Sequence, residues 1–183
     1  MADPEGIRKL GAILAADVAG YSRLMQQDDE ATVATLEAYR AVFREKIQAH
    51  RGHVVDMAGD SVLAVFEAAT GAVRAASEIQ AVLAERNDAL PEARRMRFRI
   101  GVNLGELIER PDGTVYGDGV NVAARLESIG EPGGVTISGT VFDEVEQRTD
   151  LRFDAAGEHQ VKNIAKAIRV YHLRRSDAPV LAP

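Results

Sequence analysis

Two aspartates stand where the sequence predicts that strands end. Asp17 follows the apolar run 14–16, and Asp60 follows Gly59 between two runs rich in β-branched residues. The second pattern predicts a hairpin with a carboxylate near its tip. Carboxylate oxygens suit hard divalent cations, and two carboxylates from separate segments could hold a two-metal site for phosphoryl chemistry. Each aspartate could instead simply cap a turn.

A second polar pair lies later in the chain. Asn121 and Arg125 are four residues apart in a segment expected to be helical, so they share one helix face. A carboxamide beside a guanidinium can orient a sugar ring and hold a phosphate. Arg125 could instead pair with an acid across a helix interface. The sequence has no P-loop, dinucleotide-binding or zinc-protease motif.

Helix and strand patterns alternate along the chain and must position these residues. Strands are expected over residues 10–17, in a hairpin around residue 60, and over 96–108, 135–138 and 168–173. A helix is expected to begin at the acidic residues 28–30 and to end at Gly52, and further helices over 68–90, from 118 to 129 and up to 145. The buried face of the first helix is predicted to carry Val33, Leu36, Tyr39, Phe43 and Ile47.

Length and composition predict a single globular domain. The chain has 183 residues, of which 46% are hydrophobic and 27% charged. Its net charge of −6 gives no electrostatic case for nucleic acid, and the absence of cysteine excludes disulfides and thiolate metal sites. No apolar run has membrane-spanning length, and no signal-peptide pattern begins the chain. We therefore expect a soluble, cytoplasmic protein.

The order and spacing of the polar motifs match one family. Asp17, the Gly59–Asp60 hairpin and the Asn121 to Arg125 segment together resemble the catalytic domain of class III nucleotidyl cyclases, the adenylate and guanylate cyclases, in its bacterial form. The resemblance implies an α/β (α+β) fold related to the ferredoxin-like arrangement: a sandwich with a mainly antiparallel sheet flanked by helices, in a head-to-tail homodimer. It implies a lead-in over residues 1–8, a catalytic domain over 9–174 and a flexible tail or linker over 175–183.

The resemblance also implies roles for individual residues. Asp17, Asp60 and the Val18 carbonyl would hold two Mg²⁺ or Mn²⁺ ions. The substrate would be a purine nucleoside triphosphate, whose 3′-hydroxyl attacks the α-phosphate to give a 3′,5′-cyclic nucleotide and pyrophosphate. Asn121 would orient the ribose and Arg125 would stabilise charge at the α-phosphate. These two would come from the opposite subunit to the aspartates.

Contacts to the phosphates and the base are less sharply defined. Lys162 is the candidate for the phosphate-binding lysine of the closing segment, with Lys166 in reserve; either could be a solvated surface lysine. Asp56 stands where adenylate cyclases usually carry an adenine-reading lysine, and Thr114 stands at the partner position.

This departure leaves the choice of base open. Asp56 could accept from guanine N1–H and its amino group while Thr114 donates to guanine O6. Asp56 could also accept from the adenine N6 amino group, or it could face away from the base or pair with a neighbour such as Arg51. The sequence therefore leaves three outcomes: turnover of ATP, turnover of GTP, or no turnover.

Three functional classes follow. The leading prediction is a metal-dependent cyclase that makes cyclic AMP. The alternative is a catalytically weak or inactive nucleotide-sensing dimerisation module, which Asp56 motivates. A purely structural dimerisation domain would not need the two metal aspartates. A fused or interacting regulatory domain is compatible with each class.

Overall fold

One mixed sheet forms the centre of the molecule. The computed structural model describes residues 6–175. Eight strands lie in the order β2-β3-β1-β4-β6-β8-β7, with β5 paired to β4. Every neighbouring pair is antiparallel except β4 and β6. The strands are β1 (Ile7–Val18), β2 (Gly52–Asp56), β3 (Val62–Phe66), β4 (Phe98–Glu109), β5 (Val115–Tyr116), β6 (Val135–Ser138), β7 (Phe153–His159) and β8 (Ile168–Leu173).

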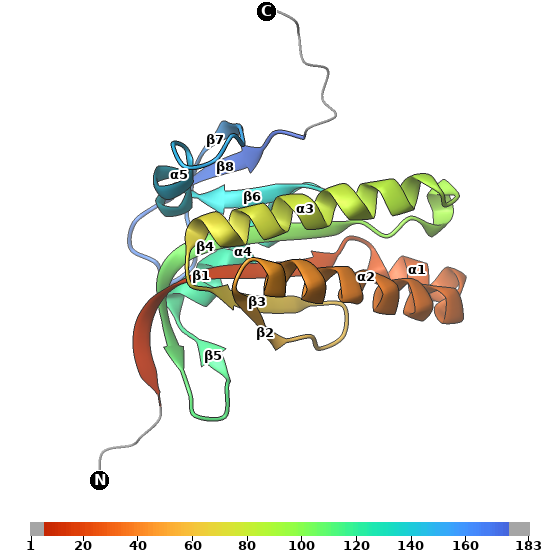
Figure 1. Cartoon of the computed structure of the whole chain (residues 1–183), viewed down its shortest axis with the longest axis horizontal. Helices are drawn as coiled ribbons and strands as arrows, with labels where there is room; N and C mark the ends of the chain where they lie inside the picture. The colour runs from red at the N-terminus through yellow and green to blue at the C-terminus, as the bar shows by residue number, and fades with distance from the viewer. Residues whose placement is uncertain (1–5, 176–183) are drawn as a thin grey trace, which may run out of the picture.

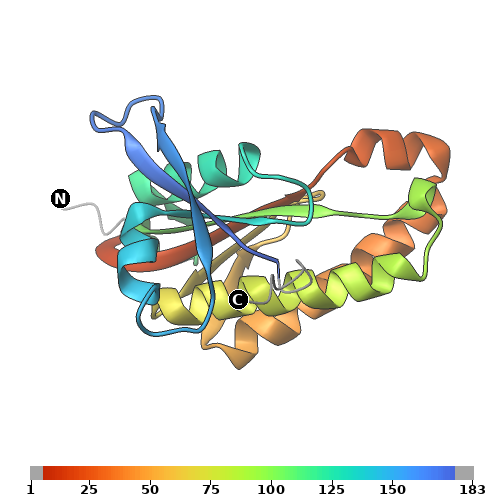
Figure 2. The same cartoon turned by 90° about the horizontal axis from the view of Figure 1, so that it is seen from above.

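Helices cover both faces of this sheet. The two long helices α2 and α3 run side by side under one face, and α4 lies on the opposite face (Figures 1 and 2). The fold-class prediction, a mainly antiparallel sheet flanked by helices, is confirmed, and the head-to-tail dimer stays a prediction. The helices are α1 (Tyr21–Gln27), α2 (Asp29–Ala49), α3 (Ala69–Asp88), α4 (Asp118–Ser128) and α5 (Gly139–Val145), with a short 3-10 turn at Glu92–Arg94.

The alternation of side chains along β1 decides which way Asp17 faces. Leu14 and Ala16 pack into the large core under α2 and α3, whereas Ile13 and Ala15 pack into the smaller core on the side of α4. Successive side chains of a strand point to opposite faces. Asp17 therefore continues the row of Ile13 and Ala15 and lies on the α4 face.

One predicted boundary and one predicted buried residue of the first long helix need correction. The first long helix does begin at the acidic residues, with Asp28 as N-cap accepting from the Ala31 amide at 3.0 Å. It ends at Ala49 rather than at Gly52, which is the first residue of β2. Val33, predicted to be buried on this helix, is 46% exposed.

Four elements were not predicted at all: α1, β5, β7 and the 3-10 turn at Glu92–Arg94. α1 is seven residues long and buries only Leu24, so it carries almost no helical hydrophobic pattern. β5 has two residues, and β7 has no buried residue to mark an inner face. Most of the tail predicted over 175–183, and the first five residues of the lead-in, lie outside the described residues. Within residues 6–175, none of the helices has the length and hydrophobicity that crossing a bilayer requires.

Candidate active site

The two predicted metal ligands meet at the end of β1. Asp60, in the turn between β2 and β3, accepts a hydrogen bond from the Val18 backbone amide through Oδ2 at 3.2 Å. Val18 directly follows Asp17. The fold thus brings near each other two carboxylates that are 43 positions apart in the sequence (60 − 17); their role as metal ligands stays a prediction.

An arginine that the sequence did not single out holds Asp17. Arg99 lies directly opposite Asp17 in the β1–β4 pairing. Its Nε donates to Asp17 Oδ1 at 3.1 Å and its Nη2 to Oδ2 at 3.0 Å. This two-point contact raises the pKa of Arg99, first through the hydrogen bond to Asp17. Such a planar fork is the strong geometry for an arginine–carboxylate pair.

A buried glutamate completes the cluster from the side of α4. Glu127 Oε1 lies 3.7 Å from Arg99 Nη2, and it has no hydrogen-bond partner among the described residues. Burial, together with Asp17 beside it, raises the pKa of Glu127 from 4.5 to about 8, although Arg99 acts in the opposite direction. Glu127 is therefore protonated near neutral pH in the metal-free protein.

Two glycines allow α4 to approach the sheet closely enough for this contact. A Cβ on Gly101 would lie 2.4 Å from the Ala123 carbonyl oxygen and 2.4 Å from the Glu127 amide nitrogen. A Cβ on Gly119 would lie 2.5 Å from the Glu106 carbonyl oxygen. Real side chains cannot occupy such positions, so glycine at both is what lets the helix rest on β4.

The amide and guanidinium pair occupies the other side of α4. Asn121 and Arg125 are exposed, while Val122, Leu126 and Glu127 are buried toward the protein. Within residues 6–175, the Asn121 and Arg125 side chains make no hydrogen bond or ion pair. The alternative in which Arg125 pairs with an acid of its own chain is therefore wrong for this structure. One chain alone points its carboxylates and its amide–guanidinium pair in different directions.

The predicted base-reading and phosphate-binding residues lie on the surface. Asp56, at the end of β2, is exposed and has no ion pair in the described part of the chain, so the expected option of pairing with Arg51 is not observed. The Thr114 hydroxyl donates to Asp112 Oδ1 at 2.5 Å, and the Thr114 amide donates to the same oxygen at 2.9 Å. Lys162 is exposed.

Lys166 is exposed in the same segment, between β7 and β8. Nothing in the geometry of a single chain distinguishes it from Lys162 as a phosphate ligand.

The donor set at the end of β1 fits a hard divalent cation. Two carboxylates meet there, and the only cation in contact with them, among residues 6–175, is Arg99. Oxygen donors of this kind suit Mg²⁺ or Mn²⁺. No cluster of three or more acidic or histidine side chains arranged as metal ligands occurs in the described residues, so further ligands have to come from backbone, water or substrate.

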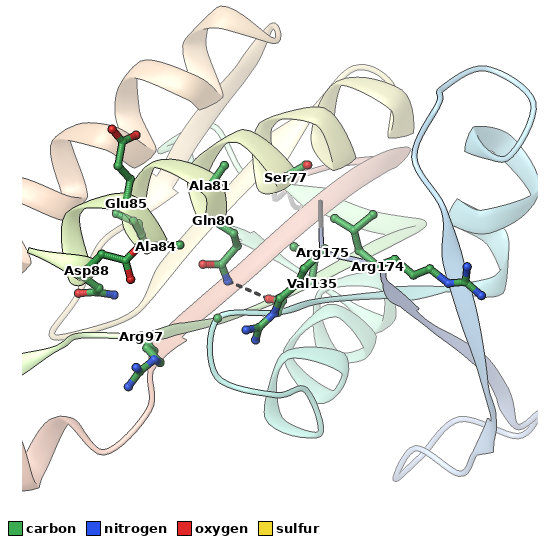
Figure 3. Close-up of a pocket in the computed structure, with 15 residues that line it drawn as sticks. Ser77, Gln80, Ala81, Ala84, Glu85, Asp88, Arg97, Val135, Arg174 and Arg175 are labelled. Carbon is green, nitrogen blue, oxygen red and sulfur yellow. Dashed lines mark hydrogen bonds between the residues drawn. The ribbon is translucent and has the colours of Figure 1, made fainter. Parts of the chain in front are cut away.

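A pocket among the described residues lies away from these side chains. A pocket of about 410 Å³ opens between α3 and the ends of β6 and β8, lined by residues such as Gln80, Arg97 and Arg174 (Figure 3). Gln80 closes its floor by donating to the Gly134 carbonyl at 2.8 Å. None of the predicted site residues lines it. The candidate site at the end of β1 is thus separate from this pocket.

Sequence reasoning missed Arg99 and Glu127, although a signal for each was present. Arg99 interrupts an otherwise apolar strand pattern between Phe98 and Ile100. Glu127 lies four residues after the buried Ala123, on the inner face of the predicted helix. A charged side chain that faces inward from a strand or helix needs a partner of opposite charge. Pairing Arg99 with Glu127 on this ground would have predicted their contact.

Comparison with known proteins identifies one family. Residues 9–175 match the family described as "Adenylate and Guanylate cyclase catalytic domain". Over 165 residues, 90% of this chain, the sequence is 44% identical to "Putative adenylate cyclase 3" of Rhizobium meliloti (strain 1021), and it spans 28% of that protein. It is 32% identical to "Adenylate cyclase 1" of the same organism over 79% of this chain and 24% of that one. The chain thus spans less than a third of these relatives.

Solved structures show the same fold. The crystal structure of an "Adenylate/Guanylate Cyclase/Hydrolase" from Silicibacter pomeroyi has a TM-score of 0.85 at 40% identity, covering 92% of this chain and 98% of that one. The adenylyl cyclase CyaB from P. aeruginosa shares the fold, with a TM-score of 0.81 at 23% identity over 95% of this chain and 98% of that one. With the carboxylate pair and the outward-facing amide–guanidinium pair, these likenesses establish that the chain belongs to the adenylate and guanylate cyclase catalytic domain family.

Proposed function

We propose that this chain is the catalytic domain of a nucleotidyl cyclase that converts ATP into 3′,5′-cyclic AMP and pyrophosphate. The observation that carries the proposal is the meeting of Asp17 and Asp60 through the Val18 amide, next to Arg99. The 44% identity to a protein named as an adenylate cyclase supports the reaction class. The proposed catalytic unit is residues 9–174, and the greater length of the relatives supports a fused regulatory domain in the whole protein.

The carboxylates define where the reaction takes place. Asp17 and Asp60, with the Val18 carbonyl, would hold two Mg²⁺ or Mn²⁺ ions, which when bound neutralise phosphate charge and acidify the ribose 3′-hydroxyl. The 3′-oxygen attacks the α-phosphorus, the bond from that phosphorus to the bridging oxygen breaks, and pyrophosphate leaves. The hydroxyl proton passes to solvent. Arg99, whose planar fork is used by Asp17, would hold that carboxylate in place.

The remaining groups position the nucleotide. Asn121 would orient the ribose, and Arg125 would stabilise the charge that develops at the α-phosphate. Lys162 would contact the outer phosphates. Because Asn121 and Arg125 face away from Asp17 within one chain, we propose that they serve the site of a partner chain. A head-to-tail homodimer then has two equivalent sites.

The orientation of one hydroxyl supports adenine over guanine. The Thr114 hydroxyl donates its single proton to Asp112, so toward a substrate it can only accept a hydrogen bond. The adenine N6 amino group can donate to it, and to the carboxylate of Asp56 as well. Guanine O6 would instead meet an acceptor. ATP is therefore the proposed substrate.

A second candidate function rests on Asp56. This carboxylate replaces the usual adenine-reading lysine and has no partner within residues 6–175, which favours a module that binds nucleotide without turnover. The two candidates differ in one measurement. The cyclase predicts cyclic nucleotide from the purified chain with Mn²⁺ and ATP, and less with GTP. The sensor predicts nucleotide binding with no product from either.

The shared site has its own test. Asp17→Ala and Arg125→Ala chains should each be inactive. When they are mixed, half of the dimers should be mixed dimers with one intact site, so activity should return to about a quarter of wild type. Failure to recover, with mixed dimers demonstrated by mass spectrometry, would contradict the two-chain site.

A further inference from the structure

The turn that carries Asp60 lies beyond the paired part of its hairpin. The ladder between β2 and β3 ends at the pair Asp56 and Leu63, after a bulge in β2. Residues 57–61 therefore have no ladder bonds to hold them against the sheet. Among residues 6–175, the Asp60 carboxylate has one hydrogen bond to the sheet, from the Val18 amide.

The bonds inside the turn shape it but do not anchor it. The Ser61 amide and hydroxyl both donate to the Ala58 carbonyl, at 3.1 and 2.7 Å. Gly59 adopts the left-handed conformation, with φ of 58°. These features fix a tight local loop. They leave open how far the loop lies from Asp17.

A side chain from α2 supplies the anchor. Arg40 donates through Nη2 to the Met57 carbonyl at 2.9 Å and to the Gly59 carbonyl, and through Nη1 to Glu37 at 2.8 Å. The two carbonyls lie within the three residues that precede Asp60. One guanidinium group of α2 thus binds two carbonyls of the turn. α2 lies on the face of the sheet opposite to α4.

The burial of Arg40 shows that this contact is more than a surface ion pair. Only 14% of its side chain is exposed, and its Nε is buried without a hydrogen-bond partner among the described residues. Removing a guanidinium from water is costly unless strong acceptors replace the solvent. Here most of that replacement comes from the carbonyls of the turn.

We propose that Arg40 is a positioning residue that fixes the Asp60 turn to α2 and so sets the distance between Asp60 and Asp17. This inference rests on the proposed function for its relevance to metal binding, but the contact itself does not depend on that function. Arg40 divides its contacts between two nitrogens, Nη2 for the two carbonyls and Nη1 for Glu37, whereas lysine has a single ammonium group for all three acceptors.

Charge and positioning make opposite predictions for metal binding. Arg40 is a cation near a site for dications, so removing its charge alone would strengthen metal binding. Loss of its grip on the turn would instead weaken metal binding, because Asp60 would no longer be held at the required distance. Mutation of a residue that holds a metal ligand in place typically weakens metal affinity by about 10-fold to 100-fold.

The experiment compares Arg40→Met and Arg40→Lys with Arg44→Met as the matched control. Arg44 lies one turn further along α2, is exposed, and has no hydrogen bond or ion pair within residues 6–175. Two quantities are measured on the full chain: hydrogen exchange of the Val18 and Ser61 amides, which donate to Asp60 and to the Ala58 carbonyl, and the dissociation constant for Mn²⁺ alone from the spin-resonance signal of the free ion. Circular dichroism confirms that each variant is folded.

We expect Arg40→Met to speed exchange of the Val18 and Ser61 amides about tenfold and to raise the Mn²⁺ dissociation constant about tenfold. Arg40→Lys should lie between it and wild type, and Arg44→Met should match wild type. Unchanged exchange of these two amides, or tighter Mn²⁺ binding, would overturn the inference. Wild-type protein that binds no Mn²⁺ would count against the proposed metal site, whereas the exchange data would still decide the role of Arg40.

Discussion

Replacing Glu127 by glutamine tests the electrostatics of the carboxylate cluster in one measurement. Three charged groups face Glu127: Asp17 from β1, Arg99 from β4 and Asp60 from the β2–β3 turn. Their net effect, added to burial, raises the pKa of Glu127 from 4.5 to about 8. Glutamine keeps the shape of the protonated acid but has no proton to lose. Glu127→Gln should therefore remove one specific contribution to the pH dependence of stability.

The size and sign follow from proton linkage. Between about pH 5.5 and about pH 7, Glu127 is protonated in the folded protein and ionised in the unfolded chain, so the folded state binds one more proton. The contribution to stability is complete below the unfolded pKa and is lost as the pH rises toward the folded pKa. Over this interval the free energy of unfolding falls by about 1.4 kcal/mol per pH unit, or about 2 kcal/mol in all.

The assay is urea unfolding of wild type and Glu127→Gln at several pH values in metal-free buffer containing a chelator. Other titrating groups, including the histidines, are common to both proteins and cancel in the difference. We expect the stability of wild type relative to the variant to fall by about 2 kcal/mol across the interval. A difference that stays constant with pH would refute the reasoning. It would mean that Arg99 keeps Glu127 ionised in the folded protein.

Three further predictions concern packing, chemistry and base selection. Gly101→Ala should destabilise the protein by about 2 to 4 kcal/mol in urea unfolding, because the added methyl group would lie 2.4 Å from two backbone atoms of α4. Arg125→Ala should change stability by less than about 0.5 kcal/mol, since the side chain is exposed, yet lower cyclase activity at least about a hundredfold. Asp56→Lys should shift the ratio of kcat/KM for ATP over GTP about tenfold toward ATP; an unchanged ratio would show that residue 56 does not face the base.

The sequence predicted those parts of the fold that carry a strong periodic pattern. The long helices and the central strands have regular apolar spacing, and Asp28 marks the start of α2 as its N-cap. α1, β5 and β7 could not be predicted, because they are short and bury few side chains. Their positions depend on pairing and packing with segments that are distant in the sequence. The local sequence pattern carries no information about these contacts.

The candidate site also has a part that the sequence could predict and a part that it could not. Asp17 and Asp60 could be paired by motif, and the hydrogen bond from Val18 agrees with that pairing. The contact between Arg99 and Glu127 depends on how closely α4 lies on β4. Gly101 permits this close approach, but a glycine in the sequence does not by itself predict it. Such a contact becomes visible only when strand register and helix packing are both known.

The two-sided construction of α4 has a consequence for a dimer. Its inner face holds Glu127 beside the carboxylates of its own chain, and its outer face presents Asn121 and Arg125. A three-turn helix moves as a rigid body, so a displacement on one face is a displacement on the other. If Asn121 and Arg125 serve the partner's nucleotide, binding of nucleotide at one site shifts α4 and so changes the geometry of the second site. Linkage requires that influence to be mutual, so the two sites would titrate cooperatively rather than independently.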